Sequence, residues 1–262
     1  MNQKEKGMKI RLDALHDAWN RREYVSPDPL ETLYDYEDPR DREVVGMVAS
    51  SLAYGRVAQI LISVRRVLGF MGPSPCGWLV SRESVEIEAA CAGFVHRFTK
   101  DVHMAALLTG IREAILTHGS LKSCFLAGYS PEDETLLPAL SHYVKAVKGD
   151  RLIPGHLLSD PDGKSACKKA NLFLRWMVRC DEVDPGGWHE ALPASKLIIP
   201  IDTHMHKISL ALGFTTRKAA DLKTAVEVTR HLARLNSEDP TRYDFCLTRF
   251  GIRGELNIED LL

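Results

Sequence analysis

The run IDTHMH contains residue types that suit two different kinds of chemistry. If it were a strand, His204 and His206 would share one face and could bind a divalent metal with Asp202. On a helix, residues two apart point about 200° away from each other and cannot share a metal. The following residues KISLALGF continue as a helical pattern, which favours the second interpretation. A metal-dependent hydrolase remains an alternative.

As a helix start, the same run makes Asp202 an N-cap residue. Its carboxylate would accept hydrogen bonds from backbone N–H groups that lack a partner in the first helical turn. These donors and the helix dipole favour the ionised form. Such a carboxylate either serves the helix alone or also stabilises positive charge that develops in a transition state.

A second group of side chains is the lysine cluster of Lys164, Lys168 and Lys169. Burial and neighbouring cations lower the pKa of a lysine, and a neutral amine is a nucleophile. Two alternatives stay open, solvated positions at a helix start or contacts to phosphate groups.

The elements that would position these residues have helical periodicity nearly throughout, and no convincing alternating strand pattern is present. The sequence therefore predicts an all-α fold with short connections. The expected helices cover residues 7–22, 41–54, 57–70, 83–97, 101–118, 133–148, 165–179, 203–212, 218–234 and 239–250.

Composition is that of an ordinary globular protein, with 262 residues, 45% hydrophobic and 26% charged, and a net charge of −1. The absence of a long apolar run predicts no membrane-spanning helix, and the charged N-terminus predicts no signal peptide. Six scattered cysteines without a C-x-x-C pair predict free thiols in a cytoplasmic protein with neither a structural metal nor an iron–sulfur cluster. Although the net charge of the whole chain is close to zero, residues 164–179 form a basic segment with five cations and no acid.

Two runs carry a resemblance to a known superfamily. IPIDTHMHKISLALGF and KKANLFL resemble the catalytic segments of helix-hairpin-helix DNA glycosylases of the endonuclease III and 8-oxoguanine glycosylase type. The chain also resembles an uncharacterised bacterial family related to that superfamily, through NLFLRWMVR, DPGGW and PIDTHMHKI. The resemblance implies one α-helical domain of two lobes with a cleft between them. Residues 45–165 would form one lobe, and 1–44 with 166–262 the other.

The resemblance further implies a DNA-repair glycosylase, with or without abasic-site lyase activity, that needs no cofactor or metal. Lys168 would be the nucleophile, with Lys169 as the alternative after a one-residue shift, and Asp202 would stabilise the reacting sugar. Its partner would be duplex DNA with a damaged base or an abasic site, bound by a monomer. A non-catalytic DNA- or RNA-binding relative is the alternative.

Residues expected to contact the nucleic acid follow from the same resemblance. A turn at Tyr54, Gly55 and Arg56 would enter the DNA, where Tyr54 and Arg56 could act as a wedge in the duplex or form an ordinary turn. A Pro-Gly hairpin would bind the backbone, although the extra residues HLLSDPD alter that hairpin. Two arginines could contact phosphates or pair with acids such as Asp181 and Asp184, and two tryptophans could stack a flipped base or belong to the core. The candidates are Tyr54, Arg56, Gly155, Gly163, Lys164, Arg175 and Arg179 for binding, and Trp176 and Trp188 for stacking.

Overall fold

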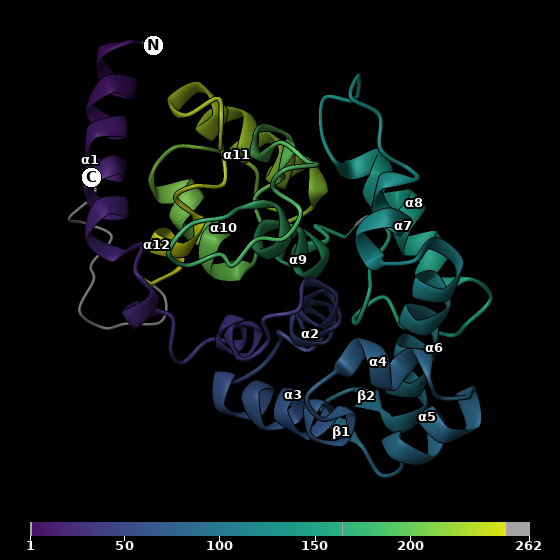
Figure 1. The fold of residues 1–262 in the computed structure, drawn as a ribbon. Helices are drawn as coiled ribbons and strands as arrows, with labels where there is room; N and C mark the ends of the chain where they lie inside the picture. Colours follow the sequence, from purple (N-terminus) through teal and green to yellow (C-terminus); the bar gives the residue numbers. More distant parts are fainter. Residues whose placement is uncertain (1, 164, 250–262) are drawn as a thin grey trace. The chain divides into compact units, whose positions relative to one another are not determined.

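A computed structural model describes residues 2–163 and 165–249 of the chain. Those residues are mostly helical and contain one two-stranded sheet, as the all-α prediction requires (Figure 1). The α-helices are α1 (Gln3–Trp19), α2 (Pro39–Ser51), α3 (Val57–Met71), α4 (Pro75–Val80), α5 (Ser84–Cys91), α6 (Asp101–His118), α7 (Leu121–Leu126), α8 (Leu137–Lys148), α9 (Lys168–Val178), α10 (Thr203–Ala211), α11 (Leu222–Leu235) and α12 (Asp244–Arg249). Short 3₁₀ turns are η1 (Arg22–Tyr24), η2 (Pro29–Asp35) and η3 (Ala194–Lys196), and the strands are β1 (Val95–His96) and β2 (Thr99–Lys100).

The chain divides into two compact units. Unit 1 comprises Met1–Tyr24, Glu134–Leu136 and Lys164–Leu262, and unit 2 comprises Val25–Asp133 and Leu137–Gly163. Residues 25–44 were expected in the lobe that contains residues 1–24 and 166–262. They belong to unit 2 because η2 packs on α2 and α3.

Unit 1 is built around α9, whose residues from Ala170 to Val178 are all buried. α10 packs on α12, and α1, drawn in purple in Figure 1, packs on α11 and α12. The apolar run before α10 is buried and extended without joining a sheet. The backbone N–H of Ile199 in this run donates to the Thr229 hydroxyl at 3.0 Å.

Unit 2 is built around α6, which packs on α4, α5, α7 and α8. Gly110 allows α8 to approach, because a Cβ atom at this position would collide with the carbonyl oxygen of Val147. Two acids near the start of α2 extend the packing. Asp41 accepts from the N–H of Cys76 at the start of α4, and Glu43 accepts from the N–H of Leu121 at the start of α7.

Several predicted helix boundaries were wrong for local reasons. The helix expected over 83–97 ends at Cys91, because Gly93 takes a positive φ and the chain then forms the hairpin of β1 and β2. The helix expected from residue 133 begins at Leu137, and the backbone N–H of Leu136 instead donates to the carbonyl of Lys196. The short helices α4 and α7 were not predicted.

Candidate active site at the starts of α9 and α10

Asp202 is the N-cap of α10, as the sequence predicted. One oxygen, Oδ1, accepts from the backbone N–H groups of His204 and Met205, both at 2.9 Å. The residue adopts an extended backbone conformation, which is typical of an N-cap. The cap occupies Oδ1 and leaves the second oxygen, Oδ2, to face other groups.

Lys168 is the first residue of α9, and its ammonium lies beside that second oxygen. The distance from Lys168 Nζ to Asp202 Oδ2 is 3.9 Å. The exposed fractions of the two side chains are 28% and 36%, so both are reachable from solvent. Two residues that are 34 positions apart in the sequence are thus brought together at the starts of two helices.

Lys169 follows Lys168 and is half-buried. Burial, together with the positive charge of Lys168, lowers the pKa of Lys169 from 10.5 to about 7. A substantial fraction of this amine is therefore neutral near pH 7. The backbone just before the two lysines is unusual, since Cys167 takes a left-handed conformation with φ of 50°.

Asp244 of α12 supplies a buried carboxylate within electrostatic range of this pair. Burial raises the pKa of Asp244, and the charge of Arg175, which donates to its Oδ2, opposes that shift. The charges of Asp202 and Lys168 act on the pKa of Asp244 as well, raising and lowering it respectively. The partly exposed pair of Lys168 and Asp202 is therefore close to buried charged side chains, which include Asp244 and Arg175.

Arg175 and Arg179 are among these buried side chains, which corrects the prediction that they contact phosphates. The exposed fraction of each side chain is 5%. Both guanidinium groups donate to Asp184, Arg175 through Nη2 at 3.1 Å and Arg179 through Nε at 2.8 Å. The other carboxylates of the network are Asp244 on Arg175, and Asp181 and Asp239 on Arg179. The alternative that the arginines pair with acids is confirmed.

Trp176 and Trp188 are also buried and cannot stack a flipped base. Trp188 packs edge-on against Phe173 with ring centroids 5.2 Å apart. The loop that contains Trp188 folds onto α9, with Gly186 N–H donating to the Trp176 carbonyl and Trp188 N–H to the Met177 carbonyl. Both tryptophans belong to the core of unit 1.

The two histidines after Asp202 do not form a metal site. His204 is exposed, whereas His206 is buried and its Nε2 lies 2.8 Å from the carbonyl oxygen of Arg217. Across residues 2–163 and 165–249, no group of three or more His, Cys, Asp or Glu side chains is arranged to hold a metal ion. His204 and His206 thus lie on different faces of α10 and do not share one metal, as the helical interpretation predicts.

The turn between α2 and α3 carries Tyr54, Gly55 and Arg56. Tyr54 is half-buried, because its hydroxyl bonds to the His96 carbonyl at 2.9 Å and to Thr99 Oγ1 at 2.7 Å in the hairpin. Arg56 is exposed at the start of α3. Tyr54 therefore supports the hairpin and does not project as the wedge that the sequence predicted.

The predicted Pro-Gly hairpin is only partly described, since Lys164 lies outside the described residues. Gly155 and Gly163 are exposed. The extra residues between them fold back onto α8, where Asp160 and Asp162 accept from Ser141, and Asp162 pairs with Lys145 at 2.5 Å. Two carboxylates beside Gly163 disfavour the predicted phosphate contact at that end of the segment.

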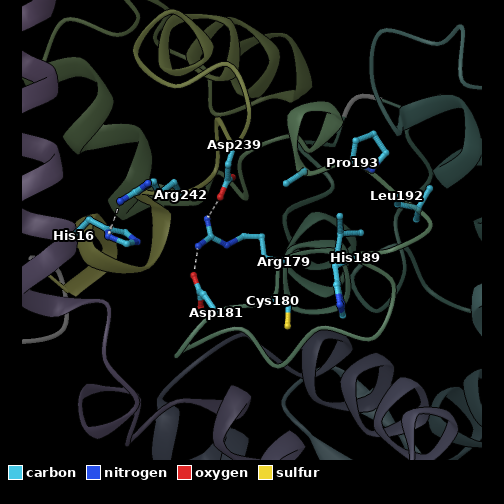
Figure 2. A pocket seen from close by; sticks show the side chains of 11 residues that line it. His16, Arg179, Cys180, Asp181, His189, Leu192, Pro193, Asp239 and Arg242 are labelled. Atoms are coloured by element: carbon cyan, nitrogen blue, oxygen red, sulfur yellow. Dashed lines mark hydrogen bonds and ion pairs between the residues drawn. The ribbon is translucent and has the colours of Figure 1, made fainter.

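A pocket of about 410 Å³ lies at the opposite end of α9, and Figure 2 shows its side chains. Ten residues of α9 rise about 15 Å, so this pocket is well separated from Lys168. Its charged groups mostly pair with one another: Arg179 with Asp181 and Asp239, and Arg242 with His16. The lining residues are His16, Val178, Arg179, Cys180, Asp181, His189, Leu192, Pro193, Ala194, Asp239 and Arg242.

The residues at the tip of the hairpin, Arg97 and Phe98, were not predicted, because residues 95–97 were assigned to the helix expected over 83–97 and residues 98–100 to the connection after it. The signal was the cluster of β-branched and aromatic residues after Gly93, which is typical of a short strand pair.

Comparison with known proteins gives one match. The model of a family described as protein of unknown function (DUF2400) matches residues 28–253, and the chain therefore belongs to that family. No curated protein and no solved structure matches the chain. No helix of the described residues has the length and apolar character to cross a membrane.

Proposed function

We propose that this member of the DUF2400 family is a DNA glycosylase with abasic-site lyase activity, built on a helix-hairpin-helix glycosylase type of fold. The observation that carries the proposal is the 3.9 Å approach of Lys168 Nζ to Asp202 Oδ2 at the starts of α9 and α10. The likeness of KKANLFL and PIDTHMHKI to the catalytic segments of that superfamily supports the same assignment. We further propose that it acts as a cytoplasmic monomer and without a cofactor.

In this mechanism the neutral amine of Lys168 attacks C1′ of a nucleotide that has left the base stack. The C1′–N bond to the base breaks, and its electron pair leaves with the base. The negative charge of Asp202 stabilises the cationic sugar as this bond lengthens. The C1′–O4′ bond of the resulting aminal then opens, O4′ takes up a proton, and a Schiff base forms between C1′ and the lysine nitrogen. At a preformed abasic site, the amine condenses with the C1′ aldehyde and releases water to give the same Schiff base.

A nucleophilic lysine needs a suitable position and a lowered pKa, and each of the two lysines has one of these properties. Lys168 has the position beside Asp202, and Lys169 has the lowered pKa of about 7. We assign the attack to Lys168 because its amine faces the carboxylate. Lys169 then acts as the neighbouring group that accepts the proton from the attacking amine.

Borohydride trapping tests the proposal with the full chain and duplexes that contain an abasic site, uracil or 8-oxoguanine. We expect a covalent adduct with wild type, none with Lys168→Ala, and a slower adduct with Lys169→Ala. An adduct that is lost in Lys169→Ala and kept in Lys168→Ala would exchange the two roles. If the adduct survives in both variants, or never forms on the abasic duplex, the lysine mechanism is wrong.

Asp202→Asn separates catalysis from helix capping, because asparagine is an equally good N-cap but carries no charge. We expect slower trapping and unchanged folding. Asp221→Asn is the control at a second N-cap, since Asp221 caps α11 by accepting from the N–H of Thr224 and also pairs with Arg217. Equal trapping rates in the two variants would contradict a catalytic role for Asp202.

A non-catalytic binding protein is the competing outcome. It predicts salt-dependent DNA binding, no adduct and no base release from any of the three duplexes. Base release without an adduct would instead indicate a glycosylase that uses water, in which Asp202 orients the nucleophile.

A further inference from the structure

The hairpin of β1 and β2 in unit 2 presents an aromatic side chain to solvent. Phe98 lies at its tip and is 66% exposed, and Val95 and Val102 beside it are 64% exposed each. The preceding residue, Arg97, has a left-handed backbone with φ of 53°, which a side-chain-bearing residue rarely adopts. This turn directs Phe98 outward at a conformational cost.

The exposure of Phe98 does not arise from a loose loop, because the residues on both sides of the tip are held. His96 is buried, with Nδ1 2.8 Å from the Ser63 hydroxyl and Nε2 3.1 Å from the Tyr54 carbonyl. Thr99 is buried and bonds to the Tyr54 hydroxyl and, at 3.0 Å, to His156 Nε2. The exposed Phe98 ring is therefore held by a hairpin whose flanking residues are buried and hydrogen-bonded.

One cation lies beside that ring, and two more lie close to the hairpin in the chain. The guanidinium of Arg97 lies 5.5 Å from the Phe98 ring centroid and also packs on Gly55, next to the exposed Arg56. Lys100 is exposed at the end of β2. Among residues 2–163 and 165–249, none of these three cations has a carboxylate within ion-pair distance.

The acid nearest in sequence is already engaged. Asp101 accepts from the backbone N–H groups of Val102 and Gly93, which hold the pKa of that carboxyl below its usual range. Two imidazoles complete the surroundings: the His156 ring lies 6.2 Å from Phe98 and 6.1 Å from His103. The surface thus combines an exposed ring with three cations and two imidazoles, beside the carboxylate of Asp101.

We propose that this hairpin surface, formed by Arg56, Arg97, Phe98, Lys100 and His156, binds a DNA strand at an unpaired base. The base stacks on Phe98, and the cations contact the flanking phosphates. A flat ring beside a guanidinium fits a nucleobase better than it fits an acidic peptide, which would use the charges and leave the ring unused. The choice of DNA as partner rests on the proposed function, but the binding step needs neither Lys168 nor turnover.

Fluorescence anisotropy with a labelled single-stranded DNA tests the surface in the full chain. We expect Phe98→Ala to weaken binding by about 5- to 150-fold, the range that corresponds to removal of one stacking aromatic. Phe98→Leu keeps apolar area without the aromatic face and should also weaken binding. Ile10→Ala is the matched control, because Ile10 is 69% exposed but lies on α1 in unit 1.

The cations are tested through salt dependence. Arg56→Gln and Lys100→Gln should each reduce the slope of log affinity against log salt by about 0.7, the value for one phosphate contact on a single strand. Lys218→Gln, an exposed lysine in unit 1, should leave the slope unchanged. Thermal unfolding of each variant excludes loss of fold as the cause.

Three results would overturn the proposal: Phe98→Ala binding within twofold of wild type, equal competition by polyglutamate, or tighter binding of RNA of the same sequence. Failure of this surface is distinguishable from failure of the glycosylase proposal. Phe98-dependent binding without a borohydride adduct rejects only the catalysis. An adduct formed by a protein whose binding ignores Phe98 rejects only the surface.

Discussion

The two ends of α9 place basic residues in opposite environments. Lys168 and Lys169 at its start are partly exposed, and Lys168 has the carboxylate of Asp202 at the edge of ion-pair distance. Arg175 and Arg179 near its end are buried and are covered by four carboxylates. The difference shows that five cations in one segment do not make a basic face, because burial and pairing decide which of them meets a ligand.

The comparison explains why each residue type suits its place. A guanidinium stays charged when buried and offers five donors in a planar fork, so it can bind several carboxylates at once. A lysine amine loses its proton when partly buried beside another cation, as the pKa of about 7 for Lys169 shows. The arginines at the end of α9 thus stabilise the fold, whereas the lysines at its start include an amine that can lose its proton near pH 7.

The largest expected effect comes from the buried end. Arg175→Met leaves Asp184 and Asp244 buried without their main partner, and we expect the free energy of unfolding to fall by about 3–5 kcal/mol. Urea unfolding measures the change. Lys168→Met is the matched change at the other end and should cost less than about 1 kcal/mol. Similar losses in both variants would erase the distinction between the two ends.

The next effect concerns the chemistry at the exposed end. Asp202→Asn keeps the cap but removes the charge beside Lys168, and we expect the single-turnover trapping rate to fall about 10²- to 10³-fold. Asp184→Asn should alter stability much more than it alters the trapping rate of the folded fraction. A larger rate loss in Asp184→Asn would place the reaction in the buried network.

A smaller effect follows from Lys169 and pH. Its pKa is about 7 in the folded protein and 10.5 in the unfolded chain, so the unfolded chain binds more protons between these values. Wild-type stability should therefore rise relative to Lys169→Met as pH increases from 7 toward 10, by at most about 1.4 kcal/mol per pH unit. Below pH 7 the difference should level off. Chemical unfolding at a series of pH values measures it, and a flat difference would contradict the lowered pKa.

The smallest effect separates the cap from the charge. Asp202→Ala removes the acceptor of two backbone N–H groups and should cost about 1 kcal/mol, whereas Asp202→Asn should cost little. Asp221→Ala should show a similar loss at α11. Thermal unfolding of the four variants measures these values, and a stable Asp202→Ala would show that the cap contributes nothing to folding.

Sequence patterns predicted the features that depend on local order. Helical periodicity identified the main helices, and the DTHMH run identified Asp202 as an N-cap. Each of these signals can be recognised from residues that are close together in the sequence. The proximity of Lys168 to Asp202 came only through a resemblance, since no local rule joins residues 34 positions apart.

What the sequence could not decide was the environment of each side chain. Arg175 and Arg179 have the spacing of a phosphate-binding face, and only the positions of Asp239 and Asp244, more than 50 residues later, show that they are paired internally. The hairpin of β1 and β2 was not predicted from the sequence either. Its strands are two residues each, which is shorter than the window in which alternation can be recognised.

The division of the chain into units has a consequence for the order of folding. Unit 2 is contained within residues 25–163, so its segments are all synthesised before α9 begins. α1 is made before unit 2, yet its packing partners α11 and α12 are made after unit 2. Domains generally fold as units during synthesis from the N-terminus. We therefore expect unit 2 to fold before α11 and α12 are available to pack against α1. The Lys168–Asp202 pair would then be among the last features of the protein to assemble.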